Sequence, residues 1–421
     1  MYGLYRLTTK LGAPLIRSKL RSRAASGKED PARLDERLGH ASSPRPEGHL
    51  VWIHAASVGE TVSVLPLINA LIEDPDLTIL ITSGTVTSAT VIEPHLSERI
   101  IHHYVPVDLV DAVERFLDHW RPDLAILVAS ELWPNLVFET LERDVPMVIV
   151  QGRLSDKSWR RWRRWHGTIS SLLSRFRIVI AQTETDADRF RSLGAQAVAV
   201  TGTLKYVAAP LTADPQELKA FQRMVGARPI WLAASTHGGE EDAVMTAHIE
   251  TRAHIPDLLM IIVPRHPERG AEIVAHATSR GLETSRRTAA DPVKSTTAIY
   301  LADTLGELGL FYRLAPVVFV GGSLVAVGGH NLIEPIQLGC AVTCGPHLDN
   351  MAEVASDLGA ADALRTVTDG HALSRDISHL MNDTDARLKL VTAQKGVLDD
   401  KAEILDLVMT ALKPYLPRRR G

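Results

Sequence analysis

The sequence is short of cysteine, of long apolar runs and of excess charge, and each shortage excludes a class of protein. Its 421 residues include two cysteines, Cys340 and Cys344, so a disulfide-stabilised scaffold is excluded and a reducing compartment is expected. No stretch reaches the roughly 18 consecutive apolar residues of a membrane-spanning helix. The net charge of -4 gives no general attraction to nucleic acid, and no nucleic-acid partner is predicted.

The rest of the composition is that of a folded globular chain. Apolar residues make up 45% and charged residues 23% of the sequence, which excludes an intrinsically disordered protein. At about 150 residues per domain, this length predicts two or three domains.

The first residues combine leucines at helical spacing with many basic side chains. Leu4, Leu7, Leu11 and Leu15 would form one stripe of a helix. The basic residues around the stripe are Arg6, Lys10, Arg17, Lys19, Arg21 and Arg23. Such a helix either lies in the interface of an anionic membrane or docks on the body of the protein, and both alternatives stay open. Residues 1–48 are predicted to be a basic, amphipathic, membrane-associating segment followed by a linker.

After this segment, short β-rich runs alternate with helix-like stretches. Leu50–His54 is the first such run, and Ile230–Ala234 restarts the pattern after a pause at 207–214. The alternation predicts an α/β fold with two Rossmann-like, doubly wound parallel-sheet domains. The first would cover 49–206 and the second 215–421, terminal helices included, with the pause as the linker. Ligands of such domains bind at the carboxyl ends of the strands.

Two carboxylates follow predicted strands of the first domain. In the His54–Glu60 motif, Gly59 would allow a tight strand-to-helix turn and Glu60 would fall near the start of the helix. The helix N-terminus favours the ionised carboxylate, which is the form that a general base for a sugar hydroxyl needs. A plain capping glutamate is the alternative. Glu131, in the Ser130–Asn135 motif, would either converge with Glu60 on one site or hold loop backbone.

Two further motifs follow predicted strands of the second domain. Arg265 lies between prolines and could bind a phosphate or carboxylate through two hydrogen bonds; a surface ion-pair cluster is the alternative. In the loop Gly321–Pro335, paired glycines that folding alone does not explain would let the backbone approach a ligand closely. A helix expected near Asn331 would offer free N–H groups to a phosphate, and Glu334 could accept ribose hydroxyl groups. The spacing matches neither a P-loop nor a dinucleotide fingerprint.

The sequence does not predict a metal site. The spacing His-Glu-x-x-His is missing, and three Asp-x-Asp matches lie at no clear strand end. The basic aromatic run Trp159–Trp165 would either hold anionic lipid headgroups or form a solvated helix face.

Taken together, these motifs resemble those of the 3-deoxy-D-manno-octulosonic acid (Kdo) transferases of Gram-negative lipid A assembly. The resemblance runs from about Leu50 to Leu416. The motifs that carry it are His54-Ala-Ala-Ser-Val-Gly-Glu60, Glu131-Leu-Trp-Pro-Asn135, Gly202-Thr-Leu-Lys205, Ser235-Thr-His237, Pro264-Arg-His-Pro-Glu-Arg269 and Gly328-Gly-His-Asn331. It implies a GT-B architecture with an N-terminal acceptor domain, a C-terminal CMP-Kdo domain and an interdomain cleft.

The resemblance also implies a reaction. Glu60 would deprotonate the 6′-hydroxyl of a tetra-acylated lipid A precursor (lipid IVA), and attack on the anomeric carbon of CMP-Kdo would invert its configuration and expel CMP. Glu131 and Lys205 would help to stabilise the transition state, while Ser57 and Gly59 would contact the acceptor. The donor-binding residues would be Pro264, Arg265, Leu305, Gly306, Glu307, Gly322, Ser323, Asn331, Leu332, Ile333 and Glu334.

The expected partners are CMP-Kdo, a lipid A precursor and an anionic membrane surface, with no cofactor beyond the donor substrate. The expected location is the cytoplasmic face of a Gram-negative inner membrane, with peripheral attachment. A UDP-N-acetylglucosamine 2-epimerase-like enzyme and a non-catalytic sugar-nucleotide sensor stay open as alternatives. The basic N-terminus and the Trp/Arg run weigh against the epimerase. The joint presence of Glu60, Glu131, Lys205 and Arg265 weighs against the sensor.

Overall fold

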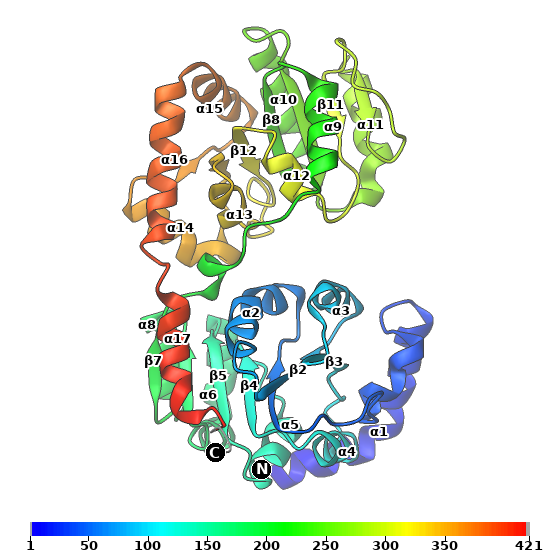
Figure 1. The fold of residues 1–421 in the computed structure, drawn as a ribbon, viewed down its shortest axis with the longest axis vertical. Coiled ribbons are helices and arrows are strands. Elements are labelled where there is room, and N and C mark those ends of the chain that lie inside the picture. The colour runs from blue at the N-terminus through cyan, green and yellow to red at the C-terminus, as the bar shows by residue number, and fades with distance from the viewer. Residues whose placement is uncertain (1, 418–421) are drawn as a thin grey trace. The chain divides into compact units, whose positions relative to one another are not determined.

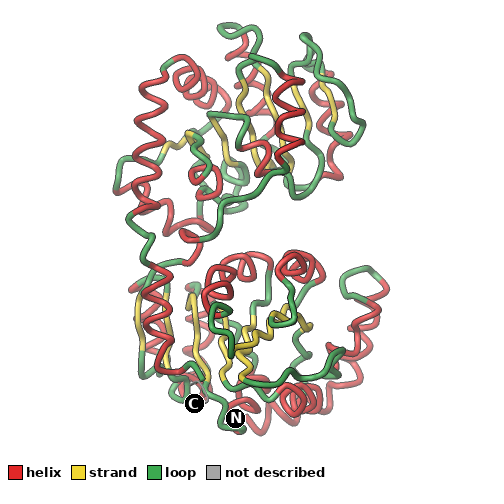
Figure 2. Tube along the Cα trace, in the orientation of Figure 1, coloured by secondary structure: helices red, strands yellow, loops and turns green. Residues whose placement is uncertain are grey.

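The computed structural model describes residues 2–417 and divides the chain into two compact units. Unit 1 contains the residues up to Ala208 together with those from Ala402 on, and unit 2 contains Ala209–Lys401. Each unit is built on one parallel sheet whose strands are connected by helices (Figure 1, Figure 2). The predicted α/β fold with two Rossmann-like sheets is therefore confirmed.

The sheet of unit 1 has seven parallel strands in the order β3-β2-β1-β4-β5-β6-β7. They are β1 (His49–His54), β2 (Leu77–Ser83), β3 (Ile100–Tyr104), β4 (Leu124–Val128), β5 (Met147–Gly152), β6 (Ile178–Ala181) and β7 (Val198–Val200). The strand order reverses between β1 and β4, which lie side by side. In doubly wound sheets, ligands bind beside the carboxyl ends of the two strands at such a reversal.

Helices pack apolar side chains against this sheet. In unit 1 they are α1 (Tyr2–Ala25), α2 (Val58–Leu71), α3 (Val86–Ile92), α4 (Val110–Trp120), α5 (Pro134–Glu142), α6 (Asp156–Arg164), α7 (His166–Leu173), α8 (Glu184–Ser192) and α17 (Ile404–Leu412), with short 3-10 segments η1 (Pro31–Leu38), η2 (Glu93–His95), η3 (Leu204–Val207) and η6 (Lys413–Tyr415). Trp52 of β1 is fully buried against Phe116 of α4, with ring centroids 5.1 Å apart. Val64 and Leu67 of α2 are also fully buried. This packing fixes the strand ends that carry the candidate site.

Unit 2 repeats the design with seven parallel strands in the order β10-β11-β9-β8-β12-β13-β14. They are β8 (Ile230–Thr236), β9 (Leu259–Pro264), β10 (Thr284–Arg286), β11 (Ile299–Leu301), β12 (Val317–Val320), β13 (Ala341–Cys344) and β14 (Arg365–Thr366). The helices are α9 (Pro215–Val225), α10 (Glu241–Arg252), α11 (Gly270–Ser279), α12 (Leu308–Tyr312), α13 (Ile333–Gln337), α14 (Ala352–Ala360), α15 (Gly370–Asn382) and α16 (Thr384–Asp399), with 3-10 segments η4 (Pro267–Arg269) and η5 (Asp349–Met351). Here the order reverses between β8 and β12, so their carboxyl ends border the expected ligand site.

The N-terminal helix α1 docks on unit 1 through polar contacts. The hydroxyl of Tyr5 donates to Asp108 Oδ2 at 2.7 Å, and Arg17 pairs with Asp111 at 2.6 Å. The leucine stripe is still largely exposed, and Leu11 and Leu15 are 73% and 77% exposed. The helix therefore docks on the protein without burying its leucine stripe.

The predicted linker after α1 is instead folded against unit 1. Glu36 of η1 is buried, and its carboxylate accepts the backbone N–H of Tyr104 at 2.7 Å and two hydrogen bonds from Arg33 at 2.8 Å. Composition suggested a linker, but a paired buried carboxylate of this kind fixes the segment in place.

The last helix, α17, also departs from the predicted domain boundaries. The second domain was predicted to cover all of 215–421, whereas α17 belongs to unit 1 (Figure 1) and packs against α2 and η3. Its contact stripe is Ile404, Val408 and Leu412, all buried at a spacing of four residues. The helical period predicts such a stripe, but it does not say which unit the stripe covers.

Candidate active site

Glu60 lies in the first turn of α2, directly after β1. Ser57 caps the helix by accepting the Glu60 N–H at 3.4 Å, and Glu60 Oε2 accepts the Ala56 N–H at 2.7 Å. The carboxylate thus takes part in capping and still lies at the reversal point of the sheet, so the two roles considered for it are compatible. Gly59 lies inside α2, outside the left-handed region. The predicted tight turn at Gly59 is wrong, because the extended backbone of Ser57 makes the turn.

The acidity of Glu60 is shifted in the direction that suits a base. Burial raises the pKa of Glu60, and the negative charge of Glu131 raises it further, against hydrogen bonds from Ala56 and Ser57. A carboxylate with a raised pKa binds a proton more strongly, which favours proton abstraction near neutral pH. Glu60 and Glu131 follow the neighbouring strands β1 and β4, so both lie at the strand ends beside which a doubly wound sheet binds its ligand.

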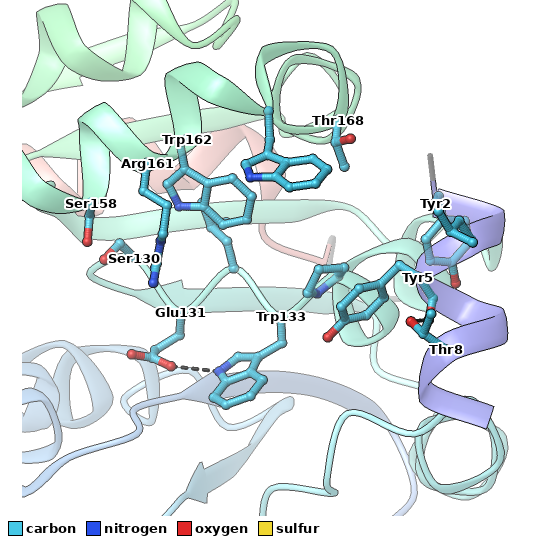
Figure 3. A pocket seen from close by; sticks show the side chains of 14 residues that line it. Tyr2, Tyr5, Thr8, Ser130, Glu131, Trp133, Ser158, Arg161, Trp162 and Thr168 are labelled. Carbon is cyan, nitrogen blue, oxygen red and sulfur yellow. Dashed lines mark hydrogen bonds between the residues drawn. The ribbon is translucent and has the colours of Figure 1, made fainter. Parts of the chain in front are cut away.

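Glu131 is held by a short loop after β4. Ala129 adopts a left-handed φ of 60° at the strand end, a conformation that side chains other than glycine rarely take. The indole Nε1–H of Trp133 donates to Glu131 Oε2 at 2.7 Å (Figure 3). The carboxylate is therefore oriented by an indole side chain.

Lys205 lies on η3, and a residue that the sequence analysis missed positions this segment. Gln151 is buried at the end of β5, and its Oε1 accepts the Leu204 N–H at 2.8 Å and the Thr203 hydroxyl at 3.0 Å. Its Nε2 donates to the Gly202 carbonyl at 3.1 Å. Because η3 packs against α2, this arrangement brings the lysine segment to the helix that carries Glu60.

In unit 2, an internal carboxylate occupies the N–H groups of the glycine-rich loop. Glu240 is fully buried and accepts the N–H groups of Gly322 at 2.7 Å, Ser323 at 3.0 Å and Leu324 at 2.8 Å. It also accepts the N–H of His237 at 2.9 Å. Gly322 and Ser323 were predicted to bind the donor, but their backbone N–H groups are already taken by Glu240. Sequence reasoning missed Glu240, which ties the ends of β8 and β12 together.

The side chain of Ser323 is likewise not accessible to the sugar-nucleotide donor. It is fully buried, and its hydroxyl donates to the Val320 carbonyl and accepts the Gly345 N–H at 2.8 Å.

The glycines of this loop are required by close packing within the protein. A Cβ on Gly322, at φ +67°, would meet the His330 ring at 2.9 Å, and one on Gly328 would meet the Asn350 side chain at 2.7 Å. Folding therefore does explain these glycines, contrary to expectation.

Three histidines from three separate motifs meet at this reversal point. The Nε2 atoms of His237 and His330 lie 2.8 Å apart, and the two rings are parallel to within 7°. The ring of His266 stands edge-on to His237, with centroids 5.5 Å apart. Burial lowers the pKa of His330 to about 4, helped by His237. All three motifs are recognisable in the sequence, but no role was predicted for these histidines.

Of the predicted donor residues at the ends of β9 and β11, Arg265, Leu305 and Gly306 are exposed, whereas Pro264 is buried in β9. Pro264 ends β9, and Arg265 is exposed and forms no ion pair within residues 2–417. The ion-pair alternative applies to Arg269 instead, which contacts Glu241 at 2.6 Å.

The loop before α12 is open but anchored. Leu305 is 75% exposed and Gly306 has a φ of 81°. Burial raises the pKa of Glu307, but hydrogen bonds from Arg287 and Thr304 bring it below its usual value. A carboxylate held ionised in this way is a good acceptor for sugar hydroxyl groups.

The segment from Asn331 to Glu334 differs from expectation. The helix α13 begins at Ile333 and has five residues. Asn331 Oδ1 accepts the Ile333 N–H at 3.0 Å, so this N–H is not free for a phosphate. The side chains of Leu332 and Ile333 are fully buried, which leaves only their backbone for a ligand. Burial raises the pKa of Glu334, so its uncharged form is favoured relative to a solvated glutamate.

Two features are absent from residues 2–417. These residues contain no group of three or more His, Cys, Asp or Glu side chains arranged to hold a metal ion. They also contain no helix whose length and hydropathy would suit a membrane crossing.

The amino-acid sequence of the chain is similar to those of known proteins. The family described as 3-Deoxy-D-manno-octulosonic-acid transferase (kdotransferase) matches residues 32–208. The 3-deoxy-D-manno-octulosonic acid transferase of Haemophilus influenzae is 34% identical over 92% of this chain and 92% of its own length. The chain belongs to the Kdo transferase family. It is therefore a glycosyltransferase, as the motifs predicted.

Other Kdo transferases extend this relationship. The one from Bordetella pertussis is 36% identical over 86% of this chain and 87% of its own length. The matched range 32–208 contains Glu60, Glu131 and Lys205, while the candidates of unit 2 lie beyond it. Among solved structures, the UDP-GlcNAc 2-epimerase from Neisseria meningitidis bound to UDP-GlcNAc covers 87% of this chain and 100% of its own, with a TM-score of 0.60 and 13% identity. That likeness concerns the fold alone.

Proposed function

We propose that this Kdo transferase moves Kdo from CMP-Kdo to the 6′-hydroxyl of a tetra-acylated lipid A precursor, with inversion at the anomeric carbon and release of CMP. The observation that carries the proposal is the pair of glutamates at the reversal point of unit 1. Glu60 has a raised pKa, caused by burial and by Glu131. One carboxylate with enhanced basicity beside a second, oriented carboxylate suits proton abstraction from a sugar hydroxyl.

In the proposed step, Glu60 takes the proton of the acceptor hydroxyl while the oxygen attacks the anomeric carbon. The bond between that carbon and the phosphate oxygen breaks, and its electron pair leaves with CMP. Glu131 would stabilise positive charge that develops on the sugar ring. Lys205 supplies a positive charge against the anionic donor. Ser57 and Gly59, next to Glu60, would contact the acceptor.

The donor side of the reaction is proposed for unit 2. Pro264, Arg265 and the loop Leu305–Glu307 lie at carboxyl ends of its strands, where doubly wound sheets bind nucleotides. The exposed Arg265 guanidinium suits a phosphate. Asn331 through Glu334 would contribute backbone groups, Glu334 and the Asn331 amide, and no metal is required by the proposal.

We also propose that the enzyme works at the cytoplasmic face of the inner membrane, attached to its surface. Two features of α1 support this. Leu4, Leu7, Leu11 and Leu15 are all at least 53% exposed along one side of the helix. Basic side chains flank this stripe, and anionic lipid attracts such helices.

The test is a transfer assay with the purified full chain, radiolabelled CMP-Kdo generated in situ, and a tetra-acylated lipid A precursor in detergent. Glu60→Gln should lower kcat by about 10²- to 10⁴-fold, because a general base is lost. The matched control is Glu184→Gln, another glutamate in the first turn of a helix of unit 1, which should transfer at the wild-type rate. Separated products also count the Kdo residues added per acceptor.

Transfer that survives in Glu60→Gln would refute the base assignment while leaving the family reaction intact. No transfer by folded wild-type protein, together with turnover of UDP-N-acetylglucosamine, would favour the epimerase alternative. No turnover of either substrate, with CMP-Kdo still bound, would favour the sensor.

A further inference from the structure

An apolar pocket of about 820 Å³ lies beside Glu131 in unit 1 (Figure 3). Its main apolar lining residues are Tyr2, Leu4, Tyr5, Trp133, Trp162 and Trp165. The volume falls within the range of about 300–1,000 Å³ typical of small-molecule sites. Apart from Glu131, the reaction proposed above assigns no task to this lining.

Three elements build the pocket wall. The helix α1 contributes Tyr2 and Tyr5, the loop before α5 contributes Trp133, and the α6–α7 region contributes Trp162 (Figure 3). The indole of Trp133 connects the pocket to the candidate active site, because its Nε1–H donates to Glu131. A ligand in the pocket would therefore lie next to a residue of the proposed reaction.

The aromatic wall formed by α1 is fixed, and the polar ends of its rings are already used. The Tyr2 hydroxyl donates to Glu139 at 3.0 Å, and its ring stacks on Phe138 with centroids 3.8 Å apart. The Tyr5 hydroxyl donates to Asp108 at 2.7 Å. With the hydroxyl groups bound elsewhere, the ring carbons are what α1 offers to a ligand.

Large apolar side chains around the pocket are left open to solvent. Leu4 is 66% exposed, Trp133 49% and Trp165 55%. Exposed aromatic side chains that gather around a hollow are typical of binding sites. Arg161 also lines the pocket (Figure 3) and forms no ion pair among residues 2–417. Its positive charge complements an anionic headgroup at the same site.

We propose that this pocket binds one acyl chain of the lipid acceptor and so places the acceptor sugar at the neighbouring glutamates. The inference deepens the proposed function and rests on it. Hydrocarbon is the occupant that matches the lining, since the pocket surface is mainly apolar and its tyrosine hydroxyl groups are satisfied. The N-terminal helix is then a wall of the acceptor site as well as a surface that faces the lipid.

The test is calorimetric titration of the full chain with alkyl maltosides of increasing chain length, each below its critical micelle concentration. Every added methylene that enters the pocket should tighten binding by about fourfold. This dependence should stop when the pocket is full. Maltose itself should show no binding.

Leu4→Glu should abolish the dependence on chain length, because it puts a charge into the lining. Leu15→Glu is the matched control: it lies on the same exposed stripe of α1 but does not line the pocket, and it should bind like the wild type. Should Leu4→Glu fail to fold, Ser158→Trp, which fills the pocket from α6, takes its place. Its control is the exposed Ser171→Trp on α7.

Equal losses in Leu4→Glu and Leu15→Glu would mean that the stripe, and not the pocket, binds alkyl chains, and would overturn the inference. Binding without dependence on chain length would do the same, as would binding of maltose alone, which indicates a sugar-stacking site. Wild-type transfer activity distinguishes the two proposals. If the wild-type enzyme is active but binds no alkyl maltoside, the acyl-pocket proposal alone is refuted. If it binds alkyl maltosides but transfers no Kdo, the proposed function is refuted.

Discussion

His237 and His330 share a hydrogen bond between their Nε2 atoms, 2.8 Å apart, at the reversal point of the second sheet. One Nε2 must donate and the other accept, so two neutral rings leave one Nδ1–H donor and one Nδ1 acceptor. One added proton turns both Nδ1 atoms into donors. Burial lowers the pKa of both rings, that of His330 to about 4. The unliganded pair is therefore neutral at pH 7.

We predict that CMP binding takes up protons at this pair. A phosphate dianion beside the rings opposes the effect of burial and raises their pKa. Other charges that act on the pair are Glu240 and Glu241, which favour protonation, and Arg265 and His266, which oppose it. Affinity for CMP should thus weaken, by up to about tenfold per pH unit, as the pH rises through the pKa of the complex.

Calorimetry in two buffers of different ionisation enthalpy measures this proton uptake. His330→Gln removes the titrating ring and should reduce the uptake. His371→Gln, at a ring paired with Glu250 on the surface of the same unit, should not. The phosphate group itself takes up protons in this range, so the difference between the two variants is the decisive quantity. No difference would mean that the pair does not contact the phosphate.

A second prediction concerns Gln151, which holds the Lys205 segment. Gln151→Asn keeps an amide and tolerates the left-handed φ of 57° at this position, but it is too short to hold Leu204 and Thr203. We expect a loss of about 2 kcal/mol in the free energy of unfolding and a fall of about tenfold in kcat, because Lys205 is displaced. Urea titration and the transfer assay measure the two effects.

The matched control for Gln151→Asn is Gln196→Asn, at an exposed amide that donates to the nearby Gly194 carbonyl. It should change neither quantity measurably. A destabilised Gln151→Asn enzyme with wild-type kcat would mean that Gln151 supports the fold but not the position of Lys205.

A third prediction tests the assignment of α17 to unit 1. Val408 is fully buried and its neighbour Leu407 is 50% exposed. Val408→Asp should cost more than about 3 kcal/mol of stability, since it buries an unpaired charge, while Leu407→Asp should stay within about 0.5 kcal/mol. Hydrogen exchange should localise the loss in Val408→Asp to unit 1. A loss confined to unit 2 would contradict the division of the chain.

Much of the fold was predictable because buried parallel strands are nearly continuous apolar runs. Runs such as Leu50–His54 and Ile230–Ala234 became β1 and β8. The strand β3 is harder to predict, because it contains His102 and His103, which look polar in sequence. Both are buried, and burial lowers the pKa of His102 to about 3, so these rings remain neutral. The strand is acceptable in a core because both rings are hydrogen-bonded, His102 Nε2 with the Ser83 hydroxyl at 2.8 Å and His103 Nδ1 with the Tyr104 carbonyl at 2.6 Å.

The two parts of the candidate site were predictable to different degrees. Glu60 and Glu131 each follow a strand directly, so the rule for doubly wound sheets pointed to them. The role of Glu240 depends on backbone groups more than 80 residues away in sequence, and no local pattern signals such a contact. The same holds for the histidine cluster, whose rings come from three loops. The glycine-rich loop misled the prediction, because close internal packing and ligand contact favour the same residue.

The last prediction uses the coupling between the two glutamates of unit 1. Glu60 must be ionised to act as a base, so the acid limb of the pH profile of kcat/KM should report its pKa. Burial and then Glu131 raise that pKa above the usual 4.5, so activity should fall, as the pH decreases, earlier than for an ordinary glutamate. Glu131→Gln removes the negative charge and should move the acid limb to lower pH, whatever it does to the maximal rate. Glu142→Gln, a surface carboxylate of the same unit paired with Arg175, should leave the limb in place. An acid limb that stays fixed in Glu131→Gln would mean that the group titrating in the free enzyme is not Glu60 coupled to Glu131, and the proposed base would have to be sought elsewhere.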